Sequence, residues 1–232
     1  ALSDAQAARL IADHDLDLLV DLTGHTQGSR PGILAHKPAR VVITHLGYHG
    51  CVGLDQVDYK LTDRLADQPG NERHQVEKLL FMEACVFPFV HVPAAADAGY
   101  GKAQLGLEGK FVFGEFVTLM KLSPRLLSAW KRILEALPEA MLAFSPINPR
   151  DEGLILAAAH RAGIGRARVV FLPAGSDDAT RRARYAAVDA VLDTFPYCGG
   201  DTAIAALDAL VPVLTLAGVR HAERTGASIL GH

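Results

Sequence analysis

The sequence has few of the features that would place it outside the cytoplasm or on nucleic acid. Only three of its 232 residues are cysteines, Cys51, Cys85 and Cys198, and none has a close cysteine partner. The spacing therefore supports neither a zinc knuckle nor a disulfide framework. No apolar run is long enough to span a bilayer. The net charge of -3 argues against a general nucleic-acid binder, which usually carries a basic face. We expect a cytoplasmic protein with no membrane or nucleic-acid partner.

Several common signatures are also missing. No basic stretch followed by an apolar run opens the chain, so no signal peptide is visible, and Ala1 in place of Met suggests a fragment or processed chain. There is no Gly-x-Ser-x-Gly elbow and no Walker sequence. No Gly-x-Gly-x-x-Gly precedes the helix expected after Ser123, which counts against a dinucleotide fold. What remains is a composition of 50% hydrophobic and 21% charged residues, enough for a sizeable core.

Apolar strands alternate with amphipathic helices along the chain. The predicted strands are residues 16–22, 41–46, 58–62, 79–82, 111–116, 141–144, 169–172, 190–193 and 213–216. The predicted helices are residues 3–13, 31–36, 123–136, 151–162, 178–187, 201–210 and 221–230. This alternation predicts an α/β fold with parallel sheets covered on both faces. Glycines cluster at residues 99–109, which places a boundary between domains 1–104 and 105–232.

The turn at residues 195–202 joins a strand to a helix. Gly199 and Gly200 let the backbone turn tightly and approach a ligand closely. The helix start then offers unpaired N–H groups and a positive dipole end, an arrangement that binds phosphate groups. An ordinary strand-to-helix turn is the alternative. Ligands of parallel sheets bind outside the carboxyl ends of the strands, which is where this turn is expected.

Basic residues follow two other predicted strands. Lys121 lies beside the start of a helix, where it could neutralise a phosphate. Arg220, His221 and Arg224 cluster at another helix start, and either arginine could pair with an anion. The alternatives are a solvated lysine and two surface arginines bonded to Glu223 and neighbouring carboxylates.

A loop after the strand 41–46 carries two histidines. His45 and His49 lie among glycines and could line a sugar or acceptor site, with a histidine as acid or base, or simply be exposed in a turn. They do not lie on a helix, which weakens a zinc interpretation. Asp15 and Asp17 have the spacing of a metal-binding aspartate pair, but they precede a strand, so we expect them to be solvated. No metal site is predicted.

Seven segments together resemble the SPINDLY/O-GlcNAc transferase family. They are DLTGHT at 21–26, LGYHG at 46–50, DYKLTD at 58–63, EKL at 77–79, KLSP at 121–124, LDTFPY at 192–197 and GAS at 226–228. Their order and spacing match along nearly the whole chain. The resemblance implies the GT-B fold, two Rossmann-like lobes usually found behind tetratricopeptide repeats. It also implies inverting, metal-independent transfer of a sugar from a nucleotide donor, usually UDP-GlcNAc or GDP-fucose, to Ser or Thr of a protein.

By this resemblance, residues 1–104 form the second half of the amino-terminal lobe, and residues 105–232 form the carboxy-terminal lobe without its final helices. The implied partners are a nucleotide sugar, UDP-GlcNAc foremost, and a protein acceptor, with oligomerisation through repeats outside this chain and no cofactor. Lys121 matches the lysine that contacts the donor diphosphate, and it and His45 are the catalytic candidates. The nucleotide-sugar site is predicted to contain Leu46, Gly47, Thr118, Lys121, Arg181, Arg184, Gly200, Asp201, Thr202, His221 and Arg224.

The sequence departs from the family pattern at several of these positions. His45 replaces the usual Trp, and Val117-Thr118 replaces an Asn-Asn or Asn-Gln pair. Arg181 stands where a histidine near the uracil is common, and Ala205 stands where an acidic residue binds the ribose hydroxyls.

Asp201 and Thr202 fall where the family has two threonines at the diphosphate-binding helix start. At about 4 Å, the Asp201 carboxylate would repel the donor by about 1 kcal/mol in water or about 4 kcal/mol near a protein surface. Three functions stay open: a protein O-glycosyltransferase, a degenerate binding module without turnover, or a GT-B enzyme with another donor. The general base is His45, His25 or a residue outside this chain.

Overall fold

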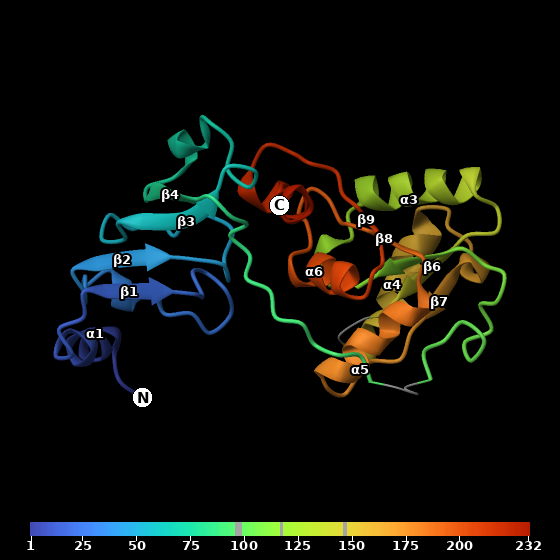
Figure 1. Ribbon diagram of the computed structural model, residues 1–232, viewed down its shortest axis with the longest axis horizontal. Coiled ribbons are helices and arrows are strands. Elements are labelled where there is room, and N and C mark those ends of the chain that lie inside the picture. The colour runs from blue at the N-terminus through green and yellow to red at the C-terminus, as the bar shows by residue number, and fades with distance from the viewer. Residues whose placement is uncertain (96–98, 117, 146–147) are drawn as a thin grey trace. The chain divides into compact units, whose positions relative to one another are not determined.

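The computed structural model describes residues 1–95, 99–116, 118–145 and 148–232, so Val117 lies outside the described residues. The chain divides into two compact units, which we call the first unit (Ala1–Pro88 with Gly218–His232) and the second unit (Phe89–Ala217). Each contains its own parallel sheet (Figure 1). The domain division between residues 104 and 105 stays a prediction, while the compact units divide at Pro88 and again at Ala217.

The first unit contains a four-stranded sheet in the order β1-β2-β3-β4, with every pairing parallel. Its strands are β1 (Leu18–Asp21), β2 (Val41–Thr44), β3 (Tyr59–Asp63) and β4 (Lys78–Met82). Its helices are α1 (Asp4–Ala12), α2 (Pro31–Leu34), the 3-10 turns η1 (Asn71–His74) and η6 (His221–Glu223), and α7 (Thr225–Gly231). Ser3 caps α1 in a capping box with Gln6, which fixes where this helix begins.

The second unit contains a five-stranded parallel sheet in the order β7-β6-β5-β8-β9. Its strands are β5 (Val112–Glu115), β6 (Met141–Phe144), β7 (Val169–Phe171), β8 (Ala190–Leu192) and β9 (Val213–Leu214). Its helices are α3 (Pro124–Ala136), α4 (Glu152–Arg161), α5 (Asp178–Ala183), α6 (Asp201–Asp208) and the 3-10 turns η2 (Leu119–Lys121), η3 (Pro149–Asp151), η4 (Arg166–Arg168) and η5 (Arg184–Ala187).

The strand order of the second unit decides where a ligand can bind. The first strand, β5, lies between β6 and β8, so the order reverses between β5 and β8. Open α/β sheets bind their ligands outside the carboxyl ends of the strands at such a switch point. The loop after β5 carries Lys121, and the loop after β8 carries the turn with Gly199 and Gly200. The topology therefore makes these two loops neighbours.

Both faces of the second sheet are buried, as predicted for a parallel sheet. On one face, Trp130 of α3 and Ile155 of α4 pack with Phe144 in one apolar cluster. On the other face, Ala143 and Val191 pack in a second cluster with side chains of α6 and η5. Burying a large apolar side chain contributes about 1.5–3 kcal/mol, so these clusters fix the sheet that carries the loops.

Three predicted elements need correction. The helix expected at 178–187 is α5 followed by the 3-10 turn η5, and the helix expected at 221–230 begins as the 3-10 turn η6. At the latter, the Glu223 carboxylate accepts the N–H groups of Val219 and Arg220, which tightens the first turn. The strand expected at 213–216 ends at Leu214, because this edge strand pairs with β8 over two residues alone. Among the helices in the described ranges, none is long and apolar enough to cross a membrane.

Candidate functional site

Lys121 lies beside the turn that precedes α6. Its Nζ atom donates a hydrogen bond to the Cys198 carbonyl oxygen at 2.8 Å and lies 4.2 Å from the centroid of the Tyr197 ring. The Ser123 hydroxyl caps α3 by accepting the Leu126 N–H, which fixes the chain just after Lys121. An ammonium group has three donors, and the Cys198 carbonyl takes one of them. The structure thus joins the lysine and the turn that the sequence analysis connected.

Gly199 leaves room for the Thr202 side chain in this turn. The Gly199 N–H donates to the Asp193 carboxylate at 2.6 Å, and a Cβ atom at residue 199 would lie 2.3 Å from the Thr202 Oγ1 atom. Asp193 also accepts the Thr215 hydroxyl at 2.8 Å, so β8 and β9 both hold the turn in place. Gly200 is the N-cap of α6, and the first N–H groups of a helix have no partner within it. They are available to an anion beside Lys121.

Two buried carboxyl groups lie near the same edge of the sheet. Glu115 ends β5 with 1% of its surface exposed, and neither of its carboxyl oxygens has a hydrogen-bond partner in the described part of the chain. Burial raises the pKa of Glu115 well above its ordinary value, and the Asp193 charge raises it further. Burial also raises the pKa of Asp193, against the hydrogen bond from Gly199. Burial lowers the pKa of Lys121, and the Asp193 charge opposes that change.

A cavity of about 490 Å³ lies beyond the carboxyl ends of β5, β6 and β7. Arg184 lines it, donates to the Ser145 hydroxyl and places its guanidinium carbon 5.3 Å from the centroid of the Phe116 ring. Arg181 also lines it and pairs with Asp178 at 2.8 Å. A cavity of this size with aromatic and cationic walls suits a nucleoside.

Asp201, Thr202 and Ala205 line the same cavity. The Asp201 side chain is 91% exposed and lies 4.0 Å from the Arg182 guanidinium. The lower of the two repulsion values above therefore applies to this carboxylate, because water surrounds it and a cation faces it. Ala205 is buried and offers no polar group to a ribose. Thr118 precedes η2, and its side chain caps no helix.

The loop after β2 in the first unit has a constrained backbone. Leu46 has a φ of 56°, and a Cβ atom at Gly47 would lie 1.7 Å from the Leu22 carbonyl oxygen. His45, Leu46 and His221 line a cavity of about 10 Å³, roughly the volume that one water molecule needs. Burial lowers the pKa of His45, and the nearby His221 lowers it further, so His45 is held neutral. Its Nδ1 atom has no hydrogen-bond partner within the described ranges.

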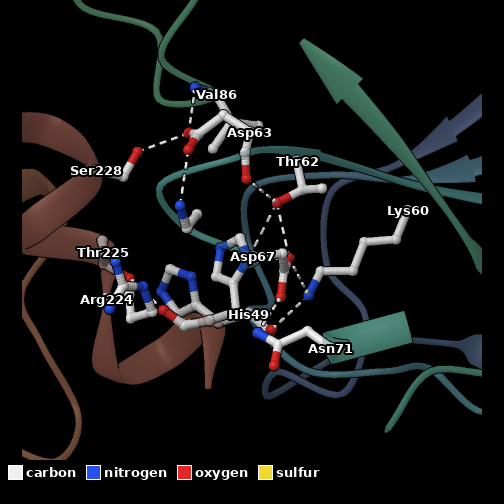
Figure 2. Close-up of polar contacts among 12 residues, drawn as sticks. His49, Lys60, Thr62, Asp63, Asp67, Asn71, Val86, Arg224, Thr225 and Ser228 are labelled. Atoms are coloured by element: carbon white, nitrogen blue, oxygen red, sulfur yellow. Dashed lines mark hydrogen bonds and ion pairs between the residues drawn. The ribbon is translucent and has the colours of Figure 1, made fainter. Parts of the chain in front are cut away.

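Lys60, which also lines this cavity, belongs to a buried polar network (Figure 2). The Asp67 carboxylate accepts hydrogen bonds from Thr62 at 2.7 Å and Asn71 at 3.3 Å, contacts His221 Nδ1 at 2.7 Å and lies 3.4 Å from the Lys60 ammonium. Burial alone would raise the pKa of Asp67, but the His221 hydrogen bond and the Lys60 charge lower it. Burial lowers the pKa of Lys60, against the Asp67 charge. The sequence does not predict this network, because His221 lies far along the chain from its other members; the one local signal is that Lys60 and Thr62 are two positions apart on β3 and so share one face.

Two side chains of the C-terminal segment, Ser228 and Arg224, are bonded to other parts of the first unit. The Asp63 carboxylate accepts the Ser228 hydroxyl at 2.6 Å and the Val86 N–H at 3.0 Å, as Figure 2 shows. The Arg224 guanidinium donates to the carbonyl oxygens of Leu65 and Gly218. The anion-binding role that the sequence suggested for Arg224 stays a prediction, because these two bonds use only part of the five N–H donors of a guanidinium.

No metal centre is visible in the part of the chain that the structure describes, where no three His, Cys, Asp or Glu side chains are grouped to hold an ion. Asp17, half of the aspartate pair noted above, is exposed and paired with Arg40.

A family model described as Glycosyl transferase family 41 matches residues 2–93 and 100–232. The chain belongs to this family. The SPINDLY protein of Arabidopsis thaliana, named a probable UDP-N-acetylglucosamine–peptide N-acetylglucosaminyltransferase, is 35% identical over 99% of this chain. A second Arabidopsis thaliana relative with the same enzyme name, SEC, is 28% identical over the whole chain. The chain spans about a quarter of the length of these relatives.

Solved structures agree with the family. A mutant O-GlcNAc transferase of Thermobaculum terrenum is 30% identical, with a TM-score of 0.86 over 99% of this chain and 44% of that chain. HepE of Anabaena, solved with UDP and glucose, is 16% identical, with a TM-score of 0.59 over 98% of this chain and 64% of its own, and shows the fold alone. The predicted α/β architecture of GT-B type, with Rossmann-like units, is confirmed, as is the resemblance to the SPINDLY/O-GlcNAc transferase family.

Proposed function

We propose that this chain is the donor-binding part of a protein O-glycosyltransferase. In this proposal the whole protein transfers GlcNAc from UDP-GlcNAc to Ser or Thr of a protein, with inversion at the anomeric carbon and without a metal ion. The observation that carries the proposal is the contact between the Lys121 ammonium and the Cys198 carbonyl, at the turn that opens α6. The similarity to O-GlcNAc transferases over 99% of the chain supports it.

The leaving diphosphate gains negative charge as the sugar departs. Lys121 and the first N–H groups of α6 are placed to stabilise that charge before the reaction begins. Asp193 favours the charged form of Lys121, because its carboxylate opposes the effect of burial on the lysine pKa. The nucleoside would lie in the cavity walled by Phe116, Arg181 and Arg184.

The remaining site assignments are part of the same proposal. Gly200, Asp201 and Thr202 would hold the diphosphate through the helix start, and Leu46 and Gly47 would lie beside the sugar. Thr118 and His45 stay candidates for donor contact and catalysis. A cytoplasmic location and oligomerisation through repeats outside this chain are proposed with them.

Two alternatives rest on specific residues. Ala205 gives a ribose no hydrogen-bond partner, and Asp201 puts a carboxylate in the cavity that would hold the donor. Both favour either a binding module without turnover or a donor other than UDP-GlcNAc.

Calorimetry and a transfer assay on the full-length protein separate these functions. The protein is titrated with UDP, GDP and their sugars, and transfer of labelled sugar to protein is then measured. The proposal expects UDP binding and GlcNAc transfer. If only GDP binds, the donor carries GDP in place of UDP. If neither nucleotide binds, the proposal that the protein is a glycosyltransferase is overturned. Lys121→Met should abolish transfer, while Lys131→Met, at a lysine paired with Glu135 on the surface of α3, should not.

A further inference from the structure

We propose that Arg182 is a second cation that binds the diphosphate of the nucleotide donor, together with Lys121. This inference rests on the proposed function, because it adds a binding residue to the donor site of that reaction. It concerns the second unit alone, since both cations and α6 belong to Phe89–Ala217. The family resemblance suggests Arg181 and Arg184 for this site and does not include Arg182.

Three of the described arginines line the cavity of about 490 Å³, and Arg182 differs from the other two. Arg184 donates to a serine hydroxyl and to a backbone carbonyl oxygen, and Arg181 donates to the Asp178 carboxylate at 2.8 Å. Within the described ranges, the Arg182 guanidinium donates no hydrogen bond, and its ion pair with Asp201 spans 4.0 Å. A guanidinium has five N–H donors, so those of Arg182 are available to an acceptor in the cavity.

The burial of Arg182 makes a bonded anion more important for it than for a surface arginine. Its side chain is 14% exposed, against 53% for Arg181 and 91% for Asp201. A charged group that leaves water loses hydration, which costs free energy unless hydrogen bonds or an opposite charge replace it. An ion pair with an exposed partner contributes little because water screens it, and 4.0 Å is beyond hydrogen-bonding distance. Asp201 therefore does not satisfy Arg182.

Asp208, at the other end of α6, does not supply the missing partner. Its charge interacts with that of Arg182, but its two oxygens contact His91 Nδ1 at 2.6 Å and accept the Val92 N–H at 3.4 Å. Tyr185 also lies near Arg182, but burial raises the pKa of this phenol and keeps it neutral. In the part of the chain that the structure describes, Arg182 is thus a mostly buried cation that forms no hydrogen bond to an anion.

Arg182 is held beside the helix start that the donor diphosphate would occupy. The Asp177 carboxylate caps α5 in a capping box, which fixes the helix that carries Arg182. The Tyr185 hydroxyl donates to the Thr202 carbonyl oxygen at 3.1 Å and ties η5 to the first turn of α6. The ion pair with Asp201, the first residue of α6, places the guanidinium at the end of this helix whose N–H groups have no partner within it.

The charges at this helix start give a second cation a function. Each phosphate of the donor carries a negative charge, and the Asp201 carboxylate adds one more. Lys121 supplies a single positive charge, and the start of α6 supplies about half of one. Arg182 offsets much of the charge that remains, and its planar fork can bond two phosphate oxygens at once. On donor binding, Arg182 exchanges a distant carboxylate for a phosphate, while the exposed Asp201 side chain stays in water.

The test measures UDP and uridine binding by calorimetry in the full-length protein, for wild type, Arg182→Met, Arg182→Lys and the control Arg132→Met. Arg132 is an exposed arginine of α3 in the same unit, so its replacement should leave both affinities unchanged. The loss of a charge-assisted hydrogen bond predicts that Arg182→Met binds UDP about 10- to 150-fold more weakly, with uridine binding unchanged. Arg182→Lys keeps the charge without the fork and should recover part of the loss. If the wild type binds GDP and not UDP, GDP and guanosine are compared instead.

Wild-type affinity of Arg182→Met for UDP would overturn the inference and leave the proposed function standing. Equal losses for UDP and uridine would also overturn it, because Arg182 would then shape the cavity and not contact phosphate. A wild type that binds neither nucleoside diphosphate would remove the proposed function and this assignment together. If Arg182→Met does not fold, a crystal structure of the wild type with its nucleoside diphosphate decides. A hydrogen bond from the Arg182 guanidinium to a phosphate oxygen supports the assignment, and a guanidinium turned away from both phosphates overturns it.

Discussion

Replacing Glu115 with glutamine should remove a loss of stability that the second unit of the wild type suffers as the pH rises. The carboxyl group is buried at the end of β5 with no hydrogen-bond partner for either oxygen in the described ranges. Its raised pKa means that the folded protein keeps this proton at pH values where the unfolded chain has lost it. Glutamine has nearly the same shape and no proton to lose.

The sign and size of the effect follow from proton linkage. Between the ordinary glutamate pKa of 4.5 and the higher pKa of the folded state, the folded state holds one more proton than the unfolded state. The free energy of unfolding of the wild type then falls by about 1.4 kcal/mol for each pH unit of increase. Glu115→Gln removes this slope. Below about pH 4.5, the free energies of unfolding of the two proteins should therefore differ by a constant amount. Above that pH the difference should grow, with the variant increasingly the more stable.

The chain's one tryptophan makes the assay specific to the second unit. Trp130 packs in the apolar cluster on one face of the second sheet, so its fluorescence reports unfolding of the unit that contains Glu115. Urea titrations at half-unit steps from pH 4 to pH 8 give the free energy of unfolding for wild type, Glu115→Gln and the surface control Glu135→Gln. The free energy of unfolding of the control should change with pH as that of the wild type does. If Glu115→Gln also follows the wild type at every pH, the Glu115 carboxyl group is not buried in its protonated form.

Two further changes test the turn and the C-terminal segment. Gly199→Ala should destabilise the second unit by about 1–3 kcal/mol in the same fluorescence assay, because the new Cβ would overlap the Thr202 Oγ1 atom at 2.3 Å and force that side chain to move. Gly153→Ala, whose Cβ meets nothing within 4 Å, should not destabilise it, and equal effects of the two changes would contradict this overlap. Ser228→Ala should cost about 1–3 kcal/mol and speed amide exchange in α7, because the buried Asp63 carboxylate loses a donor. Unchanged exchange relative to the Ser29→Ala control would mean that this bond does not anchor the segment.

The strands and helices follow from local patterns, which is why the sequence predicted them. β6 begins and ends where its apolar run does, at Met141 and Phe144, and α3 begins where Ser123 and Pro124 place it. The predicted edges were wrong where hydrogen bonds that periodicity does not report decide them. The Glu223 carboxylate bonds the N–H groups of Val219 and Arg220 within its own segment and tightens η6, and a single neighbouring strand limits β9.

The site was only partly predictable for the same reason. Lys121 and the glycine turn have local signals, but their contact depends on β5 lying beside β8, which is a property of strand order. Asp67 and His221 lie more than 150 positions apart along the chain, and their contact arises where α7 and η6 pack within the first unit. Nothing local marks Glu115 or Asp67 as buried, so their charge states could not be read from spacing.

The central claim is that Lys121 and the turn before α6 bind the donor through its diphosphate. The most direct measurement compares the affinities of UDP and uridine for wild type and Lys121→Met by calorimetry at one salt concentration. A charge-assisted hydrogen bond contributes about 1.5–3 kcal/mol, so the account predicts that UDP binds the variant roughly 10- to 150-fold more weakly while uridine binding is unchanged. Equal losses for both ligands, or no loss for UDP, would contradict it.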